Sequence, residues 1–385
     1  MRILWLTSVF PAHPNNDRNL FYWDPVQALQ EMGVEVIVLH TPSFIPFSVT
    51  TVAHEKFPVT IKTHRYLSIP RHYFRVISNY FYLKSIVPQI TKLNKTHRFD
   101  VIHAHGEICG LAAVAASKKL NIPSVVTIHG VDTCERKWKG LSGKMFCRVF
   151  NETNRIIYVG EPLQKYFRQI VNRTDHCRIV HNGCRLPVEF TGEKYKNNGD
   201  TIHIISVSNL HEGKGVDLTL LALAKLKEQG IDNWTYTIIG SGNQKKICDN
   251  IIKWHDLTDK IIYKENCLHD TVYSLLENAD IFCLPSYREA FGIAYLEAMA
   301  HGLLTIGVRG QGPQAFIENG KTGFLVEPKD ICSLINVLKL AISNFEDMTP
   351  IALAGKKYVL ENFTWEKHAE KLMTIYREMI GETNK

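Results

Sequence analysis

The sequence predicts an α/β protein in which parallel strands alternate with helices, arranged as two Rossmann-like domains. The chain opens with a strand, a helix and a second strand over residues 2–9, 20–32 and 34–40, the βαβ order of a doubly wound sheet. The same alternation restarts with a strand at 202–207, after a polar run at 189–200 that is typical of a linker. A length of 385 residues is sufficient for two such cores.

Composition excludes several classes of protein. With 45% hydrophobic and 22% charged residues, the chain has the composition of a typical globular protein. No apolar run approaches the roughly 18 residues of a membrane span. The start, MRILWLTSVFP, is expected to form the first strand rather than a signal peptide. The nine cysteines form no CxxC pair and no zinc-type cluster. We therefore expect reduced thiols, no metal site and a cytoplasmic location.

Charge is distributed unevenly along the chain. Residues 1–190 contain 24 Lys and Arg against 13 Asp and Glu, a net charge of +11, whereas residues 191–385 contain 21 against 25, a net charge of −4. A basic half suggests contact with an anionic surface or a polyanion.

The first half continues the alternation of strands and helices. Two of its predicted strands end in histidine-containing turns, His105-Gly106 and His129-Gly130. The further strands expected in this half are 59–63, 100–105, 123–128, 155–159 and 178–181, and the further helices are 107–120, 141–153 and 161–170.

A basic and aromatic segment, residues 65–87, stands out within this half. Cations such as Arg71 and Arg75 alternate there with tyrosine and phenylalanine, a pattern compatible with an amphipathic helix at a membrane interface. The alternative is a helix packed on the core with a solvated basic face.

The second half is organised around residues 285–302, PSYREAFGIAYLEAMAHG. An apolar strand, 280–284, precedes the segment, and a helix is expected over 291–300, so that Glu289 lies between the two. In an open α/β sheet, ligands bind at this edge. The free amides of the first helical residues, expected to be Phe291, Gly292 and Ile293, are suited to an anion or a sugar hydroxyl.

Glu297 follows Glu289 by eight residues, or roughly 12 Å of helix at 1.5 Å per residue. Glycosidase acid and base carboxylates are about 5 to 9.5 Å apart, so this spacing fits two parts of one long ligand better. The alternative is a helix-capping Glu289 and a solvated Glu297. The other strands expected in this half are 202–207, 234–239, 261–264 and 303–307, with helices at 268–276 and from 363 onward.

These motifs resemble the retaining glycosyltransferases of family 4. The resemblance rests on Glu289-x7-Glu297 after a strand that ends in Pro-Ser, on Lys214 within HEGKGVD, and on the later Gly-x-Gly-Pro and NGKTGFLV. It implies the GT-B fold, in which two Rossmann-like domains face each other across a cleft and a C-terminal helix crosses back to the first. The implied domains are an acceptor side at 1–188 with 366–385, and a donor side at 189–365.

The resemblance also implies residue roles. Lys214 and Asn209 match a Lys and Arg pair that clamps the donor diphosphate, although asparagine offers only a neutral hydrogen bond. Gly240 matches the turn under the nucleotide base. Glu289 would hold the sugar and Glu297 the ribose.

On the acceptor side His129 would position the sugar at the catalytic centre, and Asp132 would orient that turn or the acceptor. His105 is either structural or on the acceptor side. The family's usual glycine pair is absent from the first loop, residues 10–19.

The implied function is metal-independent, retaining transfer of a sugar from a nucleotide diphosphate, of undetermined base, to a hydroxyl of a glycan or lipid-linked acceptor, as in polysaccharide biosynthesis. We expect no cofactor and no nucleic acid partner, and an anionic membrane surface is a candidate partner that would make the protein peripheral at the inner face. The alternatives are a nucleotide-sugar epimerase of GT-B fold and an inert GT-B subunit that binds nucleotide or glycan as a scaffold.

Overall fold

Every strand pairing in the described part of the two main sheets is parallel. The computed structural model describes residues 1–15, 19–44, 57–68, 71–130, 140–169, 171, 173–185 and 201–383. The chain forms two units, unit 1 with Met1–His181 and Trp365–Lys385, and unit 2 with Asn182–Thr364. The boundary predicted from the sequence falls after residue 188, and the predicted linker, 189–200, lies outside the described residues.

Unit 1 contains a seven-stranded sheet in the order β4-β2-β1-β6-β7-β8-β9. Its inner strand β1 carries Ile3, Leu4, Trp5 and Leu6, all fully buried, because a parallel sheet is covered by helices on both faces. The strands are β1 (Arg2–Thr7), β2 (Glu35–His40), β4 (Thr60–Thr63), β6 (Val101–His105), β7 (Ser124–Ile128), β8 (Arg155–Tyr158) and β9 (Cys177–Ile179), and a separate pair is β3 (Ser43–Phe44) with β5 (Tyr66–Leu67).

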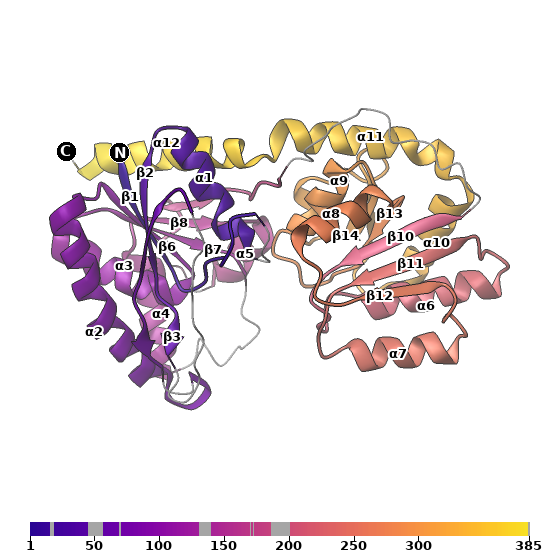
Figure 1. Ribbon diagram of the computed structural model, residues 1–385, viewed down its shortest axis with the longest axis horizontal. Coiled ribbons are helices and arrows are strands. Elements are labelled where there is room, and N and C mark those ends of the chain that lie inside the picture. The colour runs from indigo at the N-terminus through magenta and orange to yellow at the C-terminus, as the bar shows by residue number, and fades with distance from the viewer. Residues whose placement is uncertain are drawn as a thin grey trace. The chain divides into compact units, whose positions relative to one another are not determined.

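Helices cover both faces of this sheet (Figure 1). On one side α1 packs against α12, and on the other α3 packs against α2 and α4. The helices of unit 1 are η1 (Leu20–Tyr22), α1 (Asp24–Glu31), α2 (Arg71–His97), α3 (Glu107–Leu120), α4 (Gly140–Glu152), α5 (Glu161–Phe167) and α12 (Trp365–Thr383).

Helix α12 confirms the predicted return of the C-terminal helix to the first domain. His368 donates from Nδ1 to the carbonyl of His181 at 2.7 Å, and the Tyr376 hydroxyl lies 2.5 Å from His103 Nδ1. His368 and Tyr376 are both buried. The last helix therefore completes the core of unit 1.

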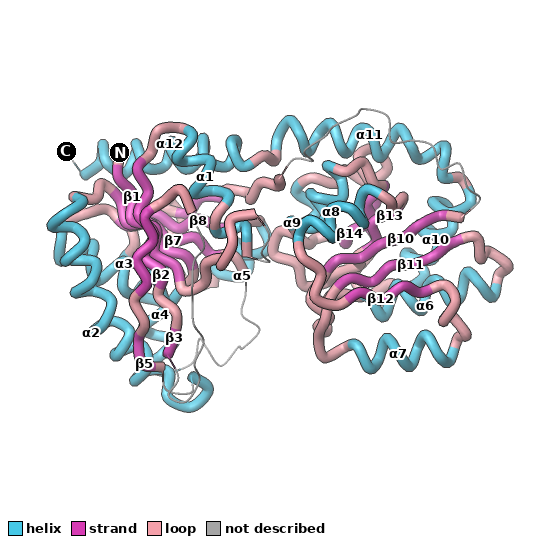
Figure 2. Tube along the Cα trace, in the orientation of Figure 1, coloured by secondary structure: helices cyan, strands magenta, loops and turns pink. Residues whose placement is uncertain are grey.

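Unit 2 contains a six-stranded sheet in the order β12-β11-β10-β13-β14-β15 (Figure 2). Helices α6, α7 and α10 pack together on one side, and α9 packs against α11 on the other. The strands are β10 (Ile202–Val207), β11 (Trp234–Ile239), β12 (Ile261–Lys264), β13 (Ile281–Cys283), β14 (Leu304–Val308) and β15 (Phe324–Val326). The helices are α6 (Val216–Glu228), α7 (Lys245–Trp254), α8 (His269–Glu277), α9 (Ile293–Ala300), η3 (Gly312–Ala315), α10 (Ile331–Ser343) and α11 (Phe345–Asn362).

Each sheet reverses its winding at one place. In unit 1 the chain proceeds from β1 to β2 in one direction and from β6 to β9 in the other, and in unit 2 the reversal falls between β10 and β13. Ligands bind beyond the carboxyl ends of the strands at such a switch point. Of the predicted site residues, Lys214 follows β10 and Glu289 follows β13 at the switch point of unit 2, and His105 ends β6 at that of unit 1.

Candidate functional site

Lys214 and Glu289 form an ion pair at the switch point of unit 2. Lys214 follows β10 and Glu289 follows β13, and the two strands are neighbours through Ile204 and Ile281. Lys214 Nζ lies 2.8 Å from Glu289 Oε2, with 26% and 12% of the two side chains exposed. Both residues are predicted from the sequence to lie in the donor site, and the fold brings their side chains together.

Glycine allows the two loops to approach this closely. Gly215 has φ of +75°, and a Cβ at this position would lie 2.4 Å from the carbonyl oxygen of Pro285. The carbonyl oxygen of Gly213 accepts hydrogen bonds from Tyr287 N–H at 2.9 Å and from the Ser286 hydroxyl at 3.1 Å. The loop that carries Lys214 is thus tied to the loop that carries Glu289.

Glu289 is also held at its backbone. Its N–H donates to Gln311 Oε1 at 3.0 Å, and its carbonyl accepts from Gly312 N–H at 3.1 Å. A Cβ on Gly312 would lie 2.3 Å from Phe291 Cα, so only glycine permits this approach. The third loop, after β14, therefore fixes the backbone that presents the Glu289 carboxylate.

The predicted start of the following helix is wrong by two residues. Helix α9 begins at Ile293, with Gly292 as N-cap at φ +97°. Phe291 precedes the helix and is buried, with its ring 5.4 Å from that of Phe316. Of the three amides expected at the helix N-terminus, only that of Ile293 belongs to α9, because the left-handed Gly292 turns the chain first.

Glu297 lies on the second turn of α9 and has two side-chain partners. Its Oε1 is 3.1 Å from His269 Nε2 and accepts from the Tyr273 hydroxyl at 3.4 Å. Only part of the span from Glu289 to Glu297 is helical, so the 12 Å spacing expected for a continuous helix does not apply. Helix α8, which carries His269 and Tyr273, positions one oxygen of this carboxylate.

Among the described glycines of unit 2, Gly240 is the one at which an added Cβ would lie nearest to another atom. It follows β11 at φ +141°, and a Cβ there would lie 1.8 Å from the carbonyl oxygen of Ser208. The Tyr263 hydroxyl donates to the carbonyl of Gly240 at 2.8 Å. The residue after Ser208 is Asn209, so the turn expected under a nucleotide base packs directly on the loop expected at the diphosphate.

Arg288, which directly precedes Glu289 in the sequence, is a further cation in these loops. Its side chain lies along Gly213, where an added Cβ would meet Arg288 Cδ at 3.1 Å. Arg288 is exposed beside the loop that carries Lys214.

Unit 1 brings His105 and His129 together at its own switch point. His105 ends β6 and His129 follows β7, and the pairing of His105 with Thr127 places both at the same edge. His105 Nδ1 lies 2.8 Å from His129 Nε2, and their rings are stacked at 5.1 Å. His103 lies behind them, with its Nε2 2.7 Å from the Thr127 hydroxyl.

Burial keeps these histidines neutral. It lowers the pKa of His129 to about 3, with a smaller contribution from the charge of His368, and it holds the pKa of His105 well below the ordinary value. A neutral imidazole has one N–H and one lone pair. The pair is therefore suited to hydrogen bonding and to a single proton transfer, not to the binding of an anion.

Aromatic rings surround the histidine pair. Trp5 lies 4.0 Å from His105 between ring centroids, and Tyr22 lies 5.1 Å from His129. Among the described residues, no hydrogen-bond partner is found for His105 Nε2 or His129 Nδ1, although both nitrogens are buried. Buried polar groups rarely lack a partner, so these two nitrogens fit a polar ligand. Asp132, predicted beside them, lies outside the described residues.

Two family models together match most of the chain. The model described as Glycosyltransferase Family 4 matches residues 23–186, and the model described as Glycosyl transferases group 1 matches residues 188–358. The chain belongs to the group 1 glycosyltransferases of family 4. It is similar to the D-inositol 3-phosphate glycosyltransferase of Paenarthrobacter aurescens, with 24% identity over 315 residues, covering 75% of this chain and 76% of that protein.

Solved structures show the same GT-B fold for this glycosyltransferase. Sucrose-phosphate synthase from Thermosynechococcus elongatus has a TM-score of 0.78 at 19% identity, covering 99% of this chain and 100% of that one. Anabaena HepE, in complex with UDP-glucose, has a TM-score of 0.73 at 17% identity, covering 98% and 100%. The predicted family and fold are confirmed.

The basic and aromatic segment of the glycosyltransferase forms the start of α2. Phe74, Ile77, Tyr80 and Phe81 are 51%, 44%, 55% and 37% exposed, and Lys84 Nζ lies 5.6 Å from the centre of the Tyr80 ring. Arg75 is half-buried, and the side chain of Arg71 lies outside the described residues. Phe74, Tyr80 and Phe81 are thus exposed, whereas Tyr82 on the same helix is buried and α2 packs against α3. The helix therefore has both an exposed aromatic face and a core-packed face.

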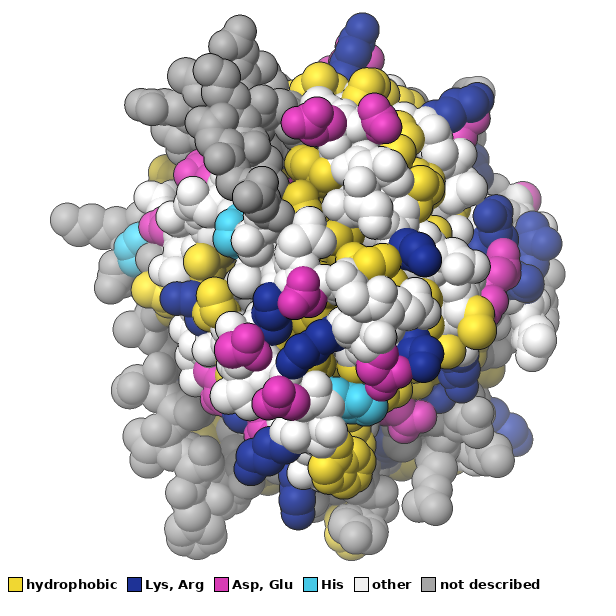
Figure 3. Space-filling model, turned by 90° about the vertical axis from the view of Figure 1, so that its right-hand side faces the viewer, with side chains coloured by type: hydrophobic (Ala, Val, Ile, Leu, Met, Phe, Trp, Pro, Cys, Tyr) yellow, Lys and Arg dark blue, Asp and Glu magenta, His cyan; other side chains and the backbone are white. Residues whose placement is uncertain are grey.

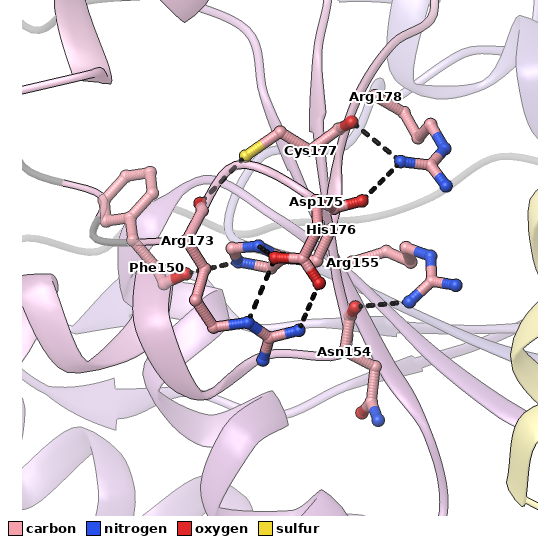
Figure 4. Close-up of polar contacts among 8 residues, drawn as sticks. All are labelled: Phe150, Asn154, Arg155, Arg173, Asp175, His176, Cys177 and Arg178. Carbon is pink, nitrogen blue, oxygen red and sulfur yellow. Dashed lines mark hydrogen bonds and ion pairs between the residues drawn. The ribbon is translucent and has the colours of Figure 1, made fainter.

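A second polar cluster, at β9, is structural. Figure 4 shows the Arg173 guanidinium facing the Asp175 carboxylate, with distances of 3.3 and 3.2 Å, and His176 Nε2 directed at the carbonyl of Phe150 at 2.8 Å. Arg178 donates to the carbonyl oxygens of Asp175 and Cys177. The arginine contacts are local to residues 173–178, and the His176 bond joins this segment to the end of α4.

Three further observations concern the described residues only. They contain no group of three or more His, Cys, Asp or Glu side chains arranged to hold a metal ion, and none of their eight cysteines forms a disulfide. No helix among them has the length and hydropathy required to cross a bilayer. On the face drawn in Figure 3, Lys and Arg side chains are interspersed with Asp and Glu rather than gathered into one patch.

Proposed function

We propose that this glycosyltransferase transfers a sugar, with retention, from a nucleoside diphosphate sugar to a hydroxyl group. The observation that carries the proposal is the Lys214–Glu289 pair, 2.8 Å apart at the switch point of unit 2. A cation and a carboxylate side by side suit the two parts of such a donor, since the diphosphate is anionic and the sugar presents hydroxyl donors. HepE, a GT-B neighbour, is described in complex with UDP-glucose, which makes this donor the first to test.

In the proposed reaction the bond between the sugar C1 and the diphosphate oxygen breaks, and the acceptor oxygen bonds to C1 on the same face. The acceptor proton passes to the departing phosphate oxygen, so no enzyme nucleophile is required. Negative charge grows on the diphosphate as the bond breaks. Lys214, with Arg288 in place of the cation missing at Asn209, stabilises this charge more in the transition state than in the ground state, without a metal ion.

Glu289 is proposed to hold sugar hydroxyls and Glu297 the ribose hydroxyls. Glu297 Oε1 is already engaged by His269 and Tyr273, so its second oxygen is assigned to the ribose. His129 is proposed to act on the sugar through Nδ1, because its Nε2 is engaged by His105.

A lipid-linked acceptor is proposed on the basis of α2. Its outward Phe74, Ile77 and Tyr80 are accompanied by Lys84 and by the +11 charge of residues 1–190, which contain 24 Lys and Arg against 13 Asp and Glu. Aromatic rings reside at the headgroup level, and each cation near an anionic leaflet contributes about 1 kcal/mol. A soluble glycan acceptor is the alternative.

The test of the proposal is sugar transfer by the purified protein. A panel of UDP-, GDP- and ADP-sugars with an alcohol acceptor should yield a glycoside of the donor's anomeric configuration, read by NMR, and Glu289→Ala should abolish it while the thermal unfolding temperature is kept. Formation of an epimerised donor without acceptor would instead support the epimerase. Binding of a donor or of a glycan without turnover across the panel would support the inert subunit.

A further inference from the structure

The Lys214–Glu289 pair joins two groups that the donor would separate. Each is the other's ion-pair partner at 2.8 Å, and the carboxylate is only 12% exposed. When a diphosphate engages Lys214, Glu289 loses this partner. Whether it gains another depends on what the diphosphate carries.

With an intact donor, sugar hydroxyls donate hydrogen bonds to Glu289 and replace the lysine. With a nucleoside diphosphate alone, nothing replaces it. The carboxylate then lies largely buried, unpaired, and close to a second anion, which is unfavourable both in desolvation and in like-charge repulsion.

The loops leave Glu289 little freedom to avoid this. Its backbone N–H is held by Gln311 Oε1 at 3.0 Å and its carbonyl by Gly312 N–H at 3.1 Å. The Lys214 loop is tied to the same segment through Gly213, whose carbonyl accepts from Tyr287 N–H at 2.9 Å. The carboxylate therefore stays near the place where Lys214 binds.

We infer that Glu289 weakens the binding of sugar-free nucleoside diphosphate by competing for Lys214, and so selects donor over product and speeds product release. This inference rests on the proposed function and adds a role to Glu289 beyond holding the sugar. After transfer the sugar departs, Glu289 pairs with Lys214 again, and the diphosphate loses its cation.

The experiment measures the dissociation constant of UDP, GDP and ADP by calorimetry, and continues with whichever binds the wild type most tightly. Glu289→Gln keeps the shape of the side chain but not its charge. We expect it to bind that nucleotide about fivefold or more tightly than the wild type, and a fluorescent analogue to dissociate correspondingly more slowly. Lys214→Ala should bind about tenfold more weakly.

A matched control is Glu228→Gln. Glu228 pairs with Lys225 at the same 2.8 Å, on the surface of α6, and its replacement should leave nucleotide affinity unchanged. In the Lys214→Ala background the gain from Glu289→Gln should shrink, because the competition for the lysine no longer exists.

The outcomes separate the inference from the proposed function. If Lys214→Ala weakens binding but Glu289→Gln binds no more tightly than wild type, the donor site stands and the inference is wrong. If the wild type binds none of the three nucleotides at millimolar concentration, or if Lys214→Ala has no effect, the proposed donor site itself is overturned.

Discussion

His105 and His129 share one hydrogen bond, from Nδ1 to Nε2 at 2.8 Å, and this contact commits the two rings to opposite roles. One nitrogen of the bond must carry the proton and the other must accept it. If His129 donates to His105, its outer Nδ1 is an acceptor and the outer Nε2 of His105 is a donor. If the proton lies on His105, both outer roles reverse.

The first prediction is that His105→Ala lowers transfer about tenfold or more without loss of fold. His129 would lose the partner that fixes its tautomer and ring position, and an unsatisfied buried group costs about 1 to 3 kcal/mol. The turnover number and the Michaelis constant for donor should be measured together, and the fold checked by circular dichroism.

A double mutant distinguishes positioning from simple damage. If His105 acts through His129, the pair of changes His105→Ala and His129→Ala should be no worse than His129→Ala alone. Additive losses would show that His105 contributes independently of His129.

The second prediction concerns acid stability. The pKa of His129 is lowered to about 3 and that of His368 to about 4, both chiefly by burial, whereas in the unfolded chain each titrates near 6.5. The unfolded state thus binds more protons as pH falls below 6.5, so the free energy of unfolding decreases there. Each histidine contributes about 1.4 kcal/mol per pH unit until the folded pKa is reached.

Urea unfolding at pH 7 and pH 5 measures this loss. His368→Gln should reduce the difference between the two pH values, because glutamine does not titrate and can still donate a hydrogen bond to the carbonyl of His181. Equal losses in wild type and His368→Gln would mean that His368 is not one of the groups responsible.

The third prediction is that Lys214→Ala costs about 2.7–4 kcal/mol of transition-state stabilisation, the scale for loss of a key electrostatic donor. Asn209→Arg should be tolerated or should tighten donor binding, since it restores a second cation. Lys225→Ala, which removes an exposed lysine of α6, is the control and should retain full activity. If the Lys214→Ala enzyme keeps an activity within a few-fold of wild type, another group stabilises the charge on the diphosphate.

The fourth prediction is that the purified protein co-sediments with anionic vesicles and not with neutral ones. The triple change Phe74→Ser, Ile77→Ser and Phe81→Ser should abolish vesicle binding, because these side chains are exposed on α2. The double change Arg71→Glu and Arg75→Glu should weaken vesicle binding. Ile262→Ser, at a residue of unit 2 that is 48% exposed, is the apolar control. If the protein does not co-sediment with anionic vesicles at low salt, a soluble acceptor is favoured.

The fifth prediction is that Gly240→Ala destabilises unit 2 by more than Gly33→Ala destabilises unit 1. Both residues have positive φ, but a Cβ at Gly240 would lie 1.8 Å from Ser208 O, whereas at Gly33 nothing lies within 4 Å. Left-handed backbone costs alanine about 1 to 2 kcal/mol, which is the loss expected at Gly33. Gly240 adds the contact with Ser208 and a φ of +141° that alanine adopts less readily, so its loss should be larger. Thermal unfolding of both variants gives the comparison.

Much of the fold was predictable because its signals are local. Buried parallel strands such as β1 are short apolar runs, and helices such as α3 begin and end at recognisable residues, so the alternation is visible in the chain. The family motif further led to the confirmed return of α12. Between residues 318 and 362 the sequence analysis named no element, and the structure has β15, α10 and α11 there.

The partners within the sites were less predictable because they come from distant segments. His269 and Tyr273 reach Glu297 from α8, a helix that carries no family motif, and Gln311 reaches Glu289 from the loop after β14. The 2.8 Å contact of His105 with His129 depends on the register of β6 and β7. The early start assigned to α9 arose because apolar spacing did not show the left-handed turn at Gly292.

The buried contacts of α12 join residues that are synthesised far apart in time. His103, in the core strand β6, has the Tyr376 hydroxyl 2.5 Å from its Nδ1, yet the ribosome adds Tyr376 only after the whole of unit 2. A nascent chain that ends after β9 therefore lacks α12, the helix that packs against α1 in unit 1. Unit 2, which runs without interruption from Asn182 to Thr364, is fully synthesised before α12 is added to unit 1.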